Sequence, residues 1–297
     1  MLSWSFSRHQ LFELCERKYN YHYYLSKGGW KNTASEETQK AFQLKKLVTL
    51  PMVTGSIAHD VIENAILNIS NEQPDSEELY NRFTKELHAK LKNQEVKLFE
   101  KYYNSPDFTK ESFAKTLEKF KKVFDNFLES KTWHMLLDEP DRFKALSVEQ
   151  FDTFKMSGIP VYAAMDLLLY DEGNDLAFIV DWKTGKPNSY DRIQLLFYSL
   201  YAMDKYNLEL GRIVCVNEYL STGEYLDFMP DEQDLEMAYD IQEYSISDMK
   251  DLLIDVDNNI PLQIGMFEAK PMDWKCASCS FKEICGDRFA EGGDTFD

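Results

Sequence analysis

The sequence predicts an α/β fold with a helical insertion, and three observations lead to this prediction. Helical spacing of apolar residues dominates the chain as far as residue 131. After Pro140, three successive segments are rich in β-branched and aromatic residues, and a helix, a hairpin and a further helix follow them. The 297 residues, 44% hydrophobic and 14% aromatic, suffice for a packed core. The expected order is therefore α, inserted helices, βββ, α, ββ, α, without an internal repeat.

Apolar spacing predicts two helices near the N-terminus. The first covers residues 5–24 and has Cys15 inside it. The second covers residues 55–69 and has His59 beside its apolar stripe, which is formed by Ile57, Val61, Ile62, Ala65 and Ile66. The helical pattern continues from Asp75 to about Lys131, so we interpret residues 70–140 as a helical insertion.

The second half of the sequence has the residue pattern of β-strands separated by turns. Residues 143–156, 160–170 and 176–183 predict a three-stranded meander, because turn residues separate them. A helix from Ser189 to Tyr206 follows, and residues 212–220 and 224–229 then form a hairpin around Gly223. Residues 230–257 are expected to present an acidic helical face, and residues 291–297 a disordered tail.

The turn at Gly173-Asn174 sets which acids face each other. This pair suits a two-residue type II′ turn, since Gly accepts a positive φ. Positions whose numbers sum to 347 are then opposed, which places Asp166 opposite Asp181, with Cβ atoms about 4.5–5.5 Å apart. Lys183 shares this face. Such paired carboxylates suit Mg²⁺ or Mn²⁺; the alternative is an ion-pair cluster on a solvated sheet face.

Three groups of residues together resemble the motifs of RecB-like PD-(D/E)XK nucleases, which include the AddAB-type and CRISPR-associated exonucleases. They are Gly55 with His59, then Asp166 with Asp181-Trp182-Lys183-Thr184-Gly185, and then Gln194 with Tyr198. The resemblance implies a restriction-endonuclease-like core, in which helices flank a mixed central sheet, and one nuclease domain over residues 1–297.

The resemblance also assigns roles to single residues. It implies that a divalent metal is bound by His59, Asp166, Asp181 and the carbonyl group of Trp182. Lys183 would be the catalytic lysine.

The remaining motif residues would support this site. Gln194 and Tyr198, one helical turn apart, would position the site or the DNA strand. Taken alone, His59 fits a histidine at a helix edge, and Gln194 fits a surface amide. Glu149, on the first predicted strand, is a candidate for a supporting residue, although a single strand glutamate is usually solvated.

Four of the five cysteines form a one-plus-three pattern. Cys276, Cys279 and Cys285 follow C-x2-C-x5-C spacing, and Cys15 stands near the N-terminus. This pattern resembles that of cluster-binding RecB-like nucleases and implies a 4Fe-4S cluster that packs residues 270–290 on the N-terminal helix. A structural zinc site with four thiolates is the alternative. Cys215 lies in an apolar run and is expected in the core.

The net charge of −18 opposes tight binding of nucleic acid, because Lys and Arg normally neutralise the phosphates. Local basic and aromatic residues can nevertheless line a channel for one strand. The candidates are Arg8, Arg17 and Lys18 with Tyr19, Tyr21 and Tyr23, and a stripe of Lys115, Lys119 and Lys122 that fits an ordinary solvated face equally well.

These features predict a Mg²⁺- or Mn²⁺-dependent deoxyribonuclease, an exonuclease on single-stranded DNA or DNA ends in repair, recombination or defence. The acidity favours a helicase or a defence-system protein as partner. One alternative is a DNA-end-binding accessory subunit with weak or silent catalysis, and another is an RNA nuclease or defence effector. No apolar run is long enough for a membrane span and the start MLSWSFSRHQ is not a secretory signal, so a cytoplasmic location without membrane contact is expected.

Overall fold

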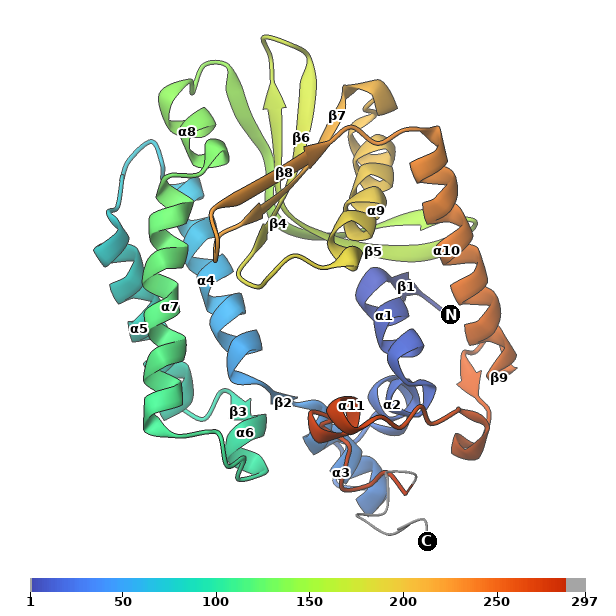
Figure 1. Ribbon diagram of the computed structural model, residues 1–297. Coiled ribbons are helices and arrows are strands. Elements are labelled where there is room, and N and C mark those ends of the chain that lie inside the picture. The colour runs from blue at the N-terminus through green and yellow to red at the C-terminus, as the bar shows by residue number, and fades with distance from the viewer. Residues whose placement is uncertain (1, 287–297) are drawn as a thin grey trace, which may run out of the picture.

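A mixed six-stranded sheet forms the centre of the computed structural model, which describes residues 2–286 (Figure 1). Its strands are β1 Trp4–Ser5, β4 Phe143–Met156, β5 Ile159–Asp171, β6 Leu176–Lys183, β7 Ile213–Tyr219 and β8 Glu224–Phe228. The order along the sheet is β1-β5-β6-β7-β8, and β4 also pairs with β5. The β1–β5 and β6–β7 pairs are parallel, and the other pairs are antiparallel. The predicted α/β fold with a mixed central sheet is confirmed.

Helices cover both faces of this sheet. The α-helices of residues 2–286 are α1 Phe6–Leu14, α2 Glu16–Asn20, α3 Glu36–Lys45, α4 Leu50–Leu67, α5 Ser76–Lys92, α6 Phe99–Tyr102, α7 Lys110–Leu128, α8 Lys131–Asp138, α9 Ser189–Tyr206, α10 Glu232–Asp251 and α11 Asp273–Ala277. A π-helix covers Tyr21–Leu25, and short strands pair as β2 Leu47–Val48 with β3 Lys97–Leu98 and as β9 Leu253–Asp255 with β10 Ile260–Pro261. None of the helices within residues 2–286 is both long and apolar enough to cross a bilayer.

Alternation along the strands divides the core into two layers. Leu168, Ile179 and Cys215 pack with α9 on one face of the sheet. Leu167 and Val180 pack with α4 and α7 on the other face. Successive side chains of a strand point to opposite faces, so each central strand contributes to both layers.

The predicted insertion is helical, since α5, α6, α7 and α8 occupy most of it. Asp75 and Glu78 form a capping box at the start of α5. The rings of Phe83 and Phe120 stack with centroids 4.5 Å apart and join α5 to α7. The buried residues of α4 extend this cluster to the sheet, so the inserted helices support the helix that carries His59.

The N-terminal segment differs from the single predicted helix. Trp4 and Ser5 pair with β5 instead, and helical structure breaks at Cys15, which is extended at φ −172° and ψ 114°. Cys15 therefore lies between α1 and α2 and not inside a helix.

The turn between β5 and β6 also differs from its prediction. Asp171 pairs with Leu176, so the loop has four residues, 172–175, and its residue with positive φ is Asp175 at 56°. Asp171 stabilises the loop by accepting hydrogen bonds from the backbone N–H groups of Gly173 and Asn174. The predicted two-residue type II′ turn was wrong, but the longer loop has the same centre, and the register with positions summing to 347 is confirmed by Leu167 opposite Val180.

The C-terminal segment lies against the N-terminal helices. Arg17 donates a hydrogen bond from Nε to the carbonyl oxygen of Phe267 at 3.0 Å, and Tyr21 donates one from its hydroxyl to that of Ile284 at 3.2 Å. The ring of Phe281, which is buried, packs against that of Tyr21. The predicted tail at residues 291–297 lies outside the described residues.

Candidate active site

The candidate site begins where β5 and β6 separate. The pairing of these strands ends at Leu167 and Val180, and the carboxylate of the next residue, Asp166, accepts a hydrogen bond from the backbone N–H of Trp182 at 2.6 Å. Asp166 and Asp181 are both buried, at 7% and 3% exposure. Where the strands diverge, the side chain of Asp166 thus accepts the hydrogen bond of a β6 backbone N–H. This contact brings the carboxylates of Asp166 and Asp181 close together.

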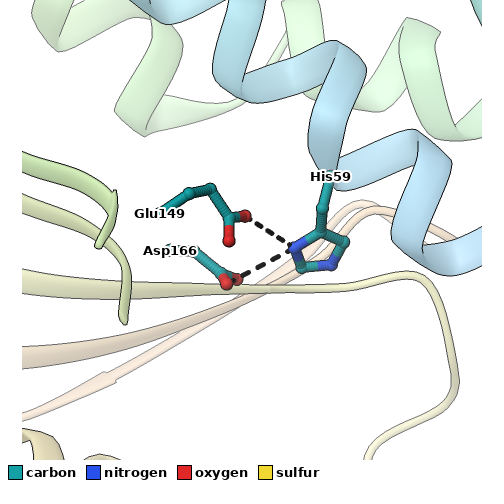
Figure 2. A group of neighbouring side chains, drawn as sticks. All are labelled: His59, Glu149 and Asp166. Atoms are coloured by element: carbon teal, nitrogen blue, oxygen red, sulfur yellow. Dashed lines mark hydrogen bonds and ion pairs between the residues drawn. The ribbon is translucent and has the colours of Figure 1, made fainter. Parts of the chain in front are cut away.

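Three side chains from three elements meet at this point, as Figure 2 shows. Nδ1 of His59, on α4, lies 3.1 Å from Oε1 of Glu149 on β4 and 3.3 Å from Oδ1 of Asp166 on β5. One potential ligand atom from each of the three lies within 4.8 Å of the others. In residues 2–286 this is the one group of three or more His, Cys, Asp or Glu side chains that is so compact. One imidazole and two carboxylates form a donor set that suits Mn²⁺ or Mg²⁺.

The backbone of Glu149 explains how it joins the site. Its φ is +45°, in the left-handed region, whereas the register of β4 with β5 is the same at Val148 and at Gln150. A residue with positive φ departs from regular strand geometry, and its side chain departs from the regular alternation with it. We expected at most a supporting role for Glu149, whereas the structure places it beside His59 and Asp166.

Two of the predicted motif residues, Gly55 on α4 and Thr184 after β6, also lie close together. A Cβ atom added to Gly55 would lie 3.3 Å from Oγ1 of Thr184. A side chain at position 55 would therefore press on the residue that follows Lys183. Gly55 lets α4 approach the end of β6, and this approach positions His59 one turn further along.

Charge is concentrated in the buried part of the site. Burial, together with the neighbouring carboxylate of Asp166, raises the pKa of Asp181 to about 7, although Lys183 acts in the opposite direction. Burial lowers the pKa of His59, but Asp166 and Glu149 outweigh it and raise that pKa well above its usual range. These shifts indicate an excess of negative charge, which a bound cation would neutralise.

Lys183 links the acids to α9. Its Nζ lies 2.6 Å from Oδ2 of Asp181 and donates a hydrogen bond to Oε1 of Gln194 at 2.9 Å. Nε2 of Gln194 in turn donates to the hydroxyl oxygen of Tyr198 at 2.6 Å. The predicted motif residues Asp181, Lys183, Gln194 and Tyr198 thus form one continuous chain of contacts.

Strand β7 supports the neighbouring β6 residue by residue. In the parallel register, Asp181 pairs with Asn217, Trp182 with Glu218 and Lys183 with Tyr219. Asn217, Glu218 and Tyr219 are all buried.

Asn217 and Glu218 contact residues of the motif directly, and Tyr219 contacts Asp191 beside Lys183. Nδ2 of Asn217 donates to Oδ2 of Asp181 at 3.2 Å, and Nε1 of Trp182 donates to Oε2 of Glu218 at 2.9 Å. The hydroxyl of Tyr219 donates to Oδ2 of Asp191 at 2.9 Å, and the other oxygen of Asp191 lies 3.8 Å from Nζ of Lys183. Three consecutive side chains therefore fix the orientation of the predicted motif.

Sequence reasoning missed Asn217 and Glu218. Their position directly after the apolar run Ile213–Val216 could have indicated that they are buried, since the run predicts a core strand. The structure shows that this strand is buried throughout. Polar residues there must find internal partners, because a buried polar group without a hydrogen bond is costly.

The four cysteines of the predicted cluster line one small cavity of about 40 Å³. Cys15 comes from the break between α1 and α2, and Cys276, Cys279 and Cys285 come from the C-terminal segment. The sulfur atoms of no three of these cysteines lie within 4.8 Å of one another. Cys215 is separate: it is fully buried and contacts Ser199, as expected of a core residue.

Three of the nine predicted strand-binding residues are buried inside the protein. Arg8 is 6% exposed and donates two hydrogen bonds to the hydroxyl of Tyr19. Tyr19 and Tyr21 are buried as well. The prediction that Arg8, Tyr19 and Tyr21 stack against or contact a DNA strand was wrong, because the packing of the N-terminal helices uses them.

Comparison with known proteins gives one family. A family model described as the PD-(D/E)XK nuclease superfamily matches residues 3–286. A search of curated proteins found no match. Of 13 matching chains of solved structures, one titled "Crystal structure of SSO0001" is 11% identical, with a TM-score of 0.30, and the match covers 80% of this chain and 98% of the other.

Proposed function

Since the chain belongs to the PD-(D/E)XK nuclease superfamily, we propose that it is a deoxyribonuclease of the RecB-like type that depends on Mg²⁺ or Mn²⁺ and degrades single-stranded DNA or DNA ends. The observation that carries this proposal is the convergence of His59, Glu149 and Asp166 beside the pair of Asp181 and Lys183. An imidazole, three carboxylates and a lysine in one buried place are the groups that metal-assisted phosphodiester hydrolysis needs.

The metal would be held by His59, Asp166 and Asp181, with Glu149 as a further carboxylate ligand. Their oxygen and nitrogen atoms match the preferences of Mn²⁺ and Mg²⁺. The carbonyl of Trp182 is the last predicted ligand. When bound, the cation would polarise the phosphate and lower the pKa of a water molecule.

Side chains of the protein would position the attacking water, the phosphate and the catalytic lysine. Lys183 would donate a hydrogen bond to the attacking water or to a phosphate oxygen as negative charge develops. Gln194 accepts from Nζ of Lys183 and so directs the ammonium group towards Asp181. Tyr198 holds the amide of Gln194 in the orientation that this contact requires.

The cleavage assay tests the proposal directly. The protein is incubated with end-labelled single-stranded DNA in Mn²⁺, Mg²⁺ or EDTA, beside Asp181→Asn and Lys183→Met variants whose folding is checked by circular dichroism. We expect the unsubstituted protein to cleave the strand in Mn²⁺. Neither variant should cleave it, because each lacks one of the two side chains. Equal cleavage by a folded variant would refute the assignment. Labels at the 5′ and 3′ ends also give polarity, and an RNA strand of the same sequence separates deoxyribonuclease from ribonuclease activity.

We propose a 4Fe-4S cluster for the four cysteines. Four thiols around one cavity form the right donor set. The chain has a single C-x2-C pair, whereas zinc modules usually combine two such pairs, and this favours the cluster. Protein purified without oxygen should contain iron and acid-labile sulfide, while stoichiometric zinc without iron would support the alternative.

A second candidate function follows from the net charge of −18. A chain so acidic would bind DNA weakly by itself, which favours delivery of the strand by a helicase or a defence-system protein, or an accessory role in such a complex. Co-purification of a partner, with no cleavage by the isolated chain in any metal, would favour the accessory role.

A further inference from the structure

A concave surface lies at the foot of α4, between the inserted helices and the small β2–β3 sheet. We call it the lysine groove; it is lined by Gln43, Leu47, Leu91, Lys92, Gln94, Val96, Lys97, Leu98, Lys101, Tyr102, Phe108 and Phe113. Its volume is about 870 Å³. The groove is outside the candidate active site and shares no residue with it.

The charge of the lysine groove is opposite to that of the chain. Lys92, Lys97 and Lys101 line it and no acidic residue does, although the chain has 51 acidic residues against 33 basic ones. All three lysines are exposed. Within residues 2–286, the salt bridges join other lysines and leave these three without a carboxylate partner. Three ammonium groups without carboxylate partners around the lysine groove favour the binding of a polyanion.

The rest of the lining suits bases better than inorganic anions. Tyr102, Phe108 and Phe113 supply aromatic rings, and Gln43 and Gln94 supply amide groups. Phe108 and Phe113 are only half-buried. Basic residues that follow the backbone and rings on which bases stack are the common features of sites for single-stranded nucleic acid.

The place of the groove relates it to the candidate active site. Strand β3 carries Lys97 and pairs with β2, which directly precedes α4 (Figure 1). Between Leu50, where α4 starts, and His59 the helix rises roughly 14 Å, at 1.5 Å per residue. At 3.4 Å per stacked nucleotide, this distance corresponds to about four nucleotides.

We infer that the lysine groove binds the sugar-phosphate backbone of a single strand whose cleaved end lies at the His59 site. This inference rests on the proposed function and adds a second contact region about four nucleotides from the reacting phosphate. The groove would increase affinity for long strands and would leave short oligonucleotides unaffected. It also gives a chain with a net charge of −18 a local means of holding DNA.

The experiment compares binding of labelled dT4 and dT20 by fluorescence anisotropy in Ca²⁺ or EDTA over a range of salt concentrations. The groove variant carries Lys92→Ala, Lys97→Ala and Lys101→Ala. The control carries Lys31→Ala, Lys155→Ala and Lys250→Ala, which change the net charge equally at exposed positions outside the groove. Cleavage of both strands in Mn²⁺ is measured in parallel.

For dT20, we expect the groove variant to bind roughly tenfold or more weakly and to lose about 2 from the slope of log K against log salt, since each phosphate contact contributes about 0.7. Binding of dT4 should be unchanged, and the control should bind both strands like the unsubstituted protein. Equal dT20 affinity in the groove variant and the control would overturn the inference. If cleavage in Mn²⁺ persists in that case, the proposed function stands; if the unsubstituted protein neither binds nor cleaves DNA, both fall.

Discussion

Replacement of Glu218 by alanine tests whether β7 positions the residues of the site. The carboxylate of Glu218 accepts hydrogen bonds from the indole N–H of Trp182 and from the backbone N–H of Thr132 at the start of α8. Alanine leaves both buried donors without an acceptor, at about 1–3 kcal/mol each. Burial raises the pKa of Glu218, so removal of this costly charge offsets part of the loss.

The net loss should be about 2–4 kcal/mol in the free energy of unfolding, from the two unpaired donors less the relief of the buried charge. With an unfolding entropy of about 2.1 cal/mol/K per residue over 297 residues, Tm should fall by about 3–6 °C. Glu218→Gln keeps one acceptor oxygen and should recover roughly half of this loss. Trp182 lies between Asp181 and Lys183, so the alanine variant should also need more Mn²⁺ for half-maximal cleavage.

The measurements are thermal unfolding and the dependence of cleavage on Mn²⁺ concentration. Glu224→Ala is the matched control, because this glutamate is exposed on the adjacent strand β8. A Tm of the Glu218→Ala variant within 1 °C of this control, with the same Mn²⁺ requirement, would show that Glu218 does not hold Trp182 in place.

Three further predictions concern titration and burial. With a pKa of about 7 for Asp181, protons compete with the metal below that pH, so Mn²⁺ affinity measured by calorimetry should rise from pH 6 to pH 8, and a flat profile would count against Asp181 as a ligand. Arg142 lowers the pKa of Asp171, so the pair stabilises the fold fully above the unfolded pKa of about 3.9 and loses this effect as the pH falls from there through the lowered folded pKa. In urea unfolding, Arg142→Ala should lower the free energy of unfolding more at pH 7 than at pH 2, and an equal loss at both pH values would point to lost packing instead. Burial raises the pKa of Cys215 to about 12, so iodoacetamide at pH 8 should leave it unmodified by mass spectrometry until the protein is unfolded; rapid native modification would contradict its place in the core.

The strand positions and their register could be predicted because they depend on local patterns. Alternation and turn residues placed β4, β5 and β6, and the centre of the turn gave the register that opposes Leu167 to Val180. The type of turn was wrong, since the side chain of Asp171 stabilises a longer loop by hydrogen bonds that a pattern of turn residues does not reveal.

The contacts between distant elements could not be predicted from local patterns. The role of Glu149 depends on one residue with positive φ in a long strand, and those of Asn217 and Glu218 depend on which strand pairs in parallel with β6. Arg8, Tyr19 and Tyr21 failed as DNA-contact candidates for a similar reason. Composition showed that Arg8 was near aromatic rings but not that the hydroxyl of Tyr19 would bind it inside the protein.

The contacts of α2 with the C-terminal segment also have a consequence for biosynthesis. Arg17 binds the carbonyl of Phe267, 250 residues later in the chain. At 5–20 residues per second, a ribosome adds those residues in roughly 12–50 s. Throughout this time the N-terminal helices lack their final partner, and every residue of the candidate active site, from His59 to Tyr198, is made before Phe267. Synthesis that stops early would therefore release a chain with all its catalytic side chains but without the segment that secures its first helices.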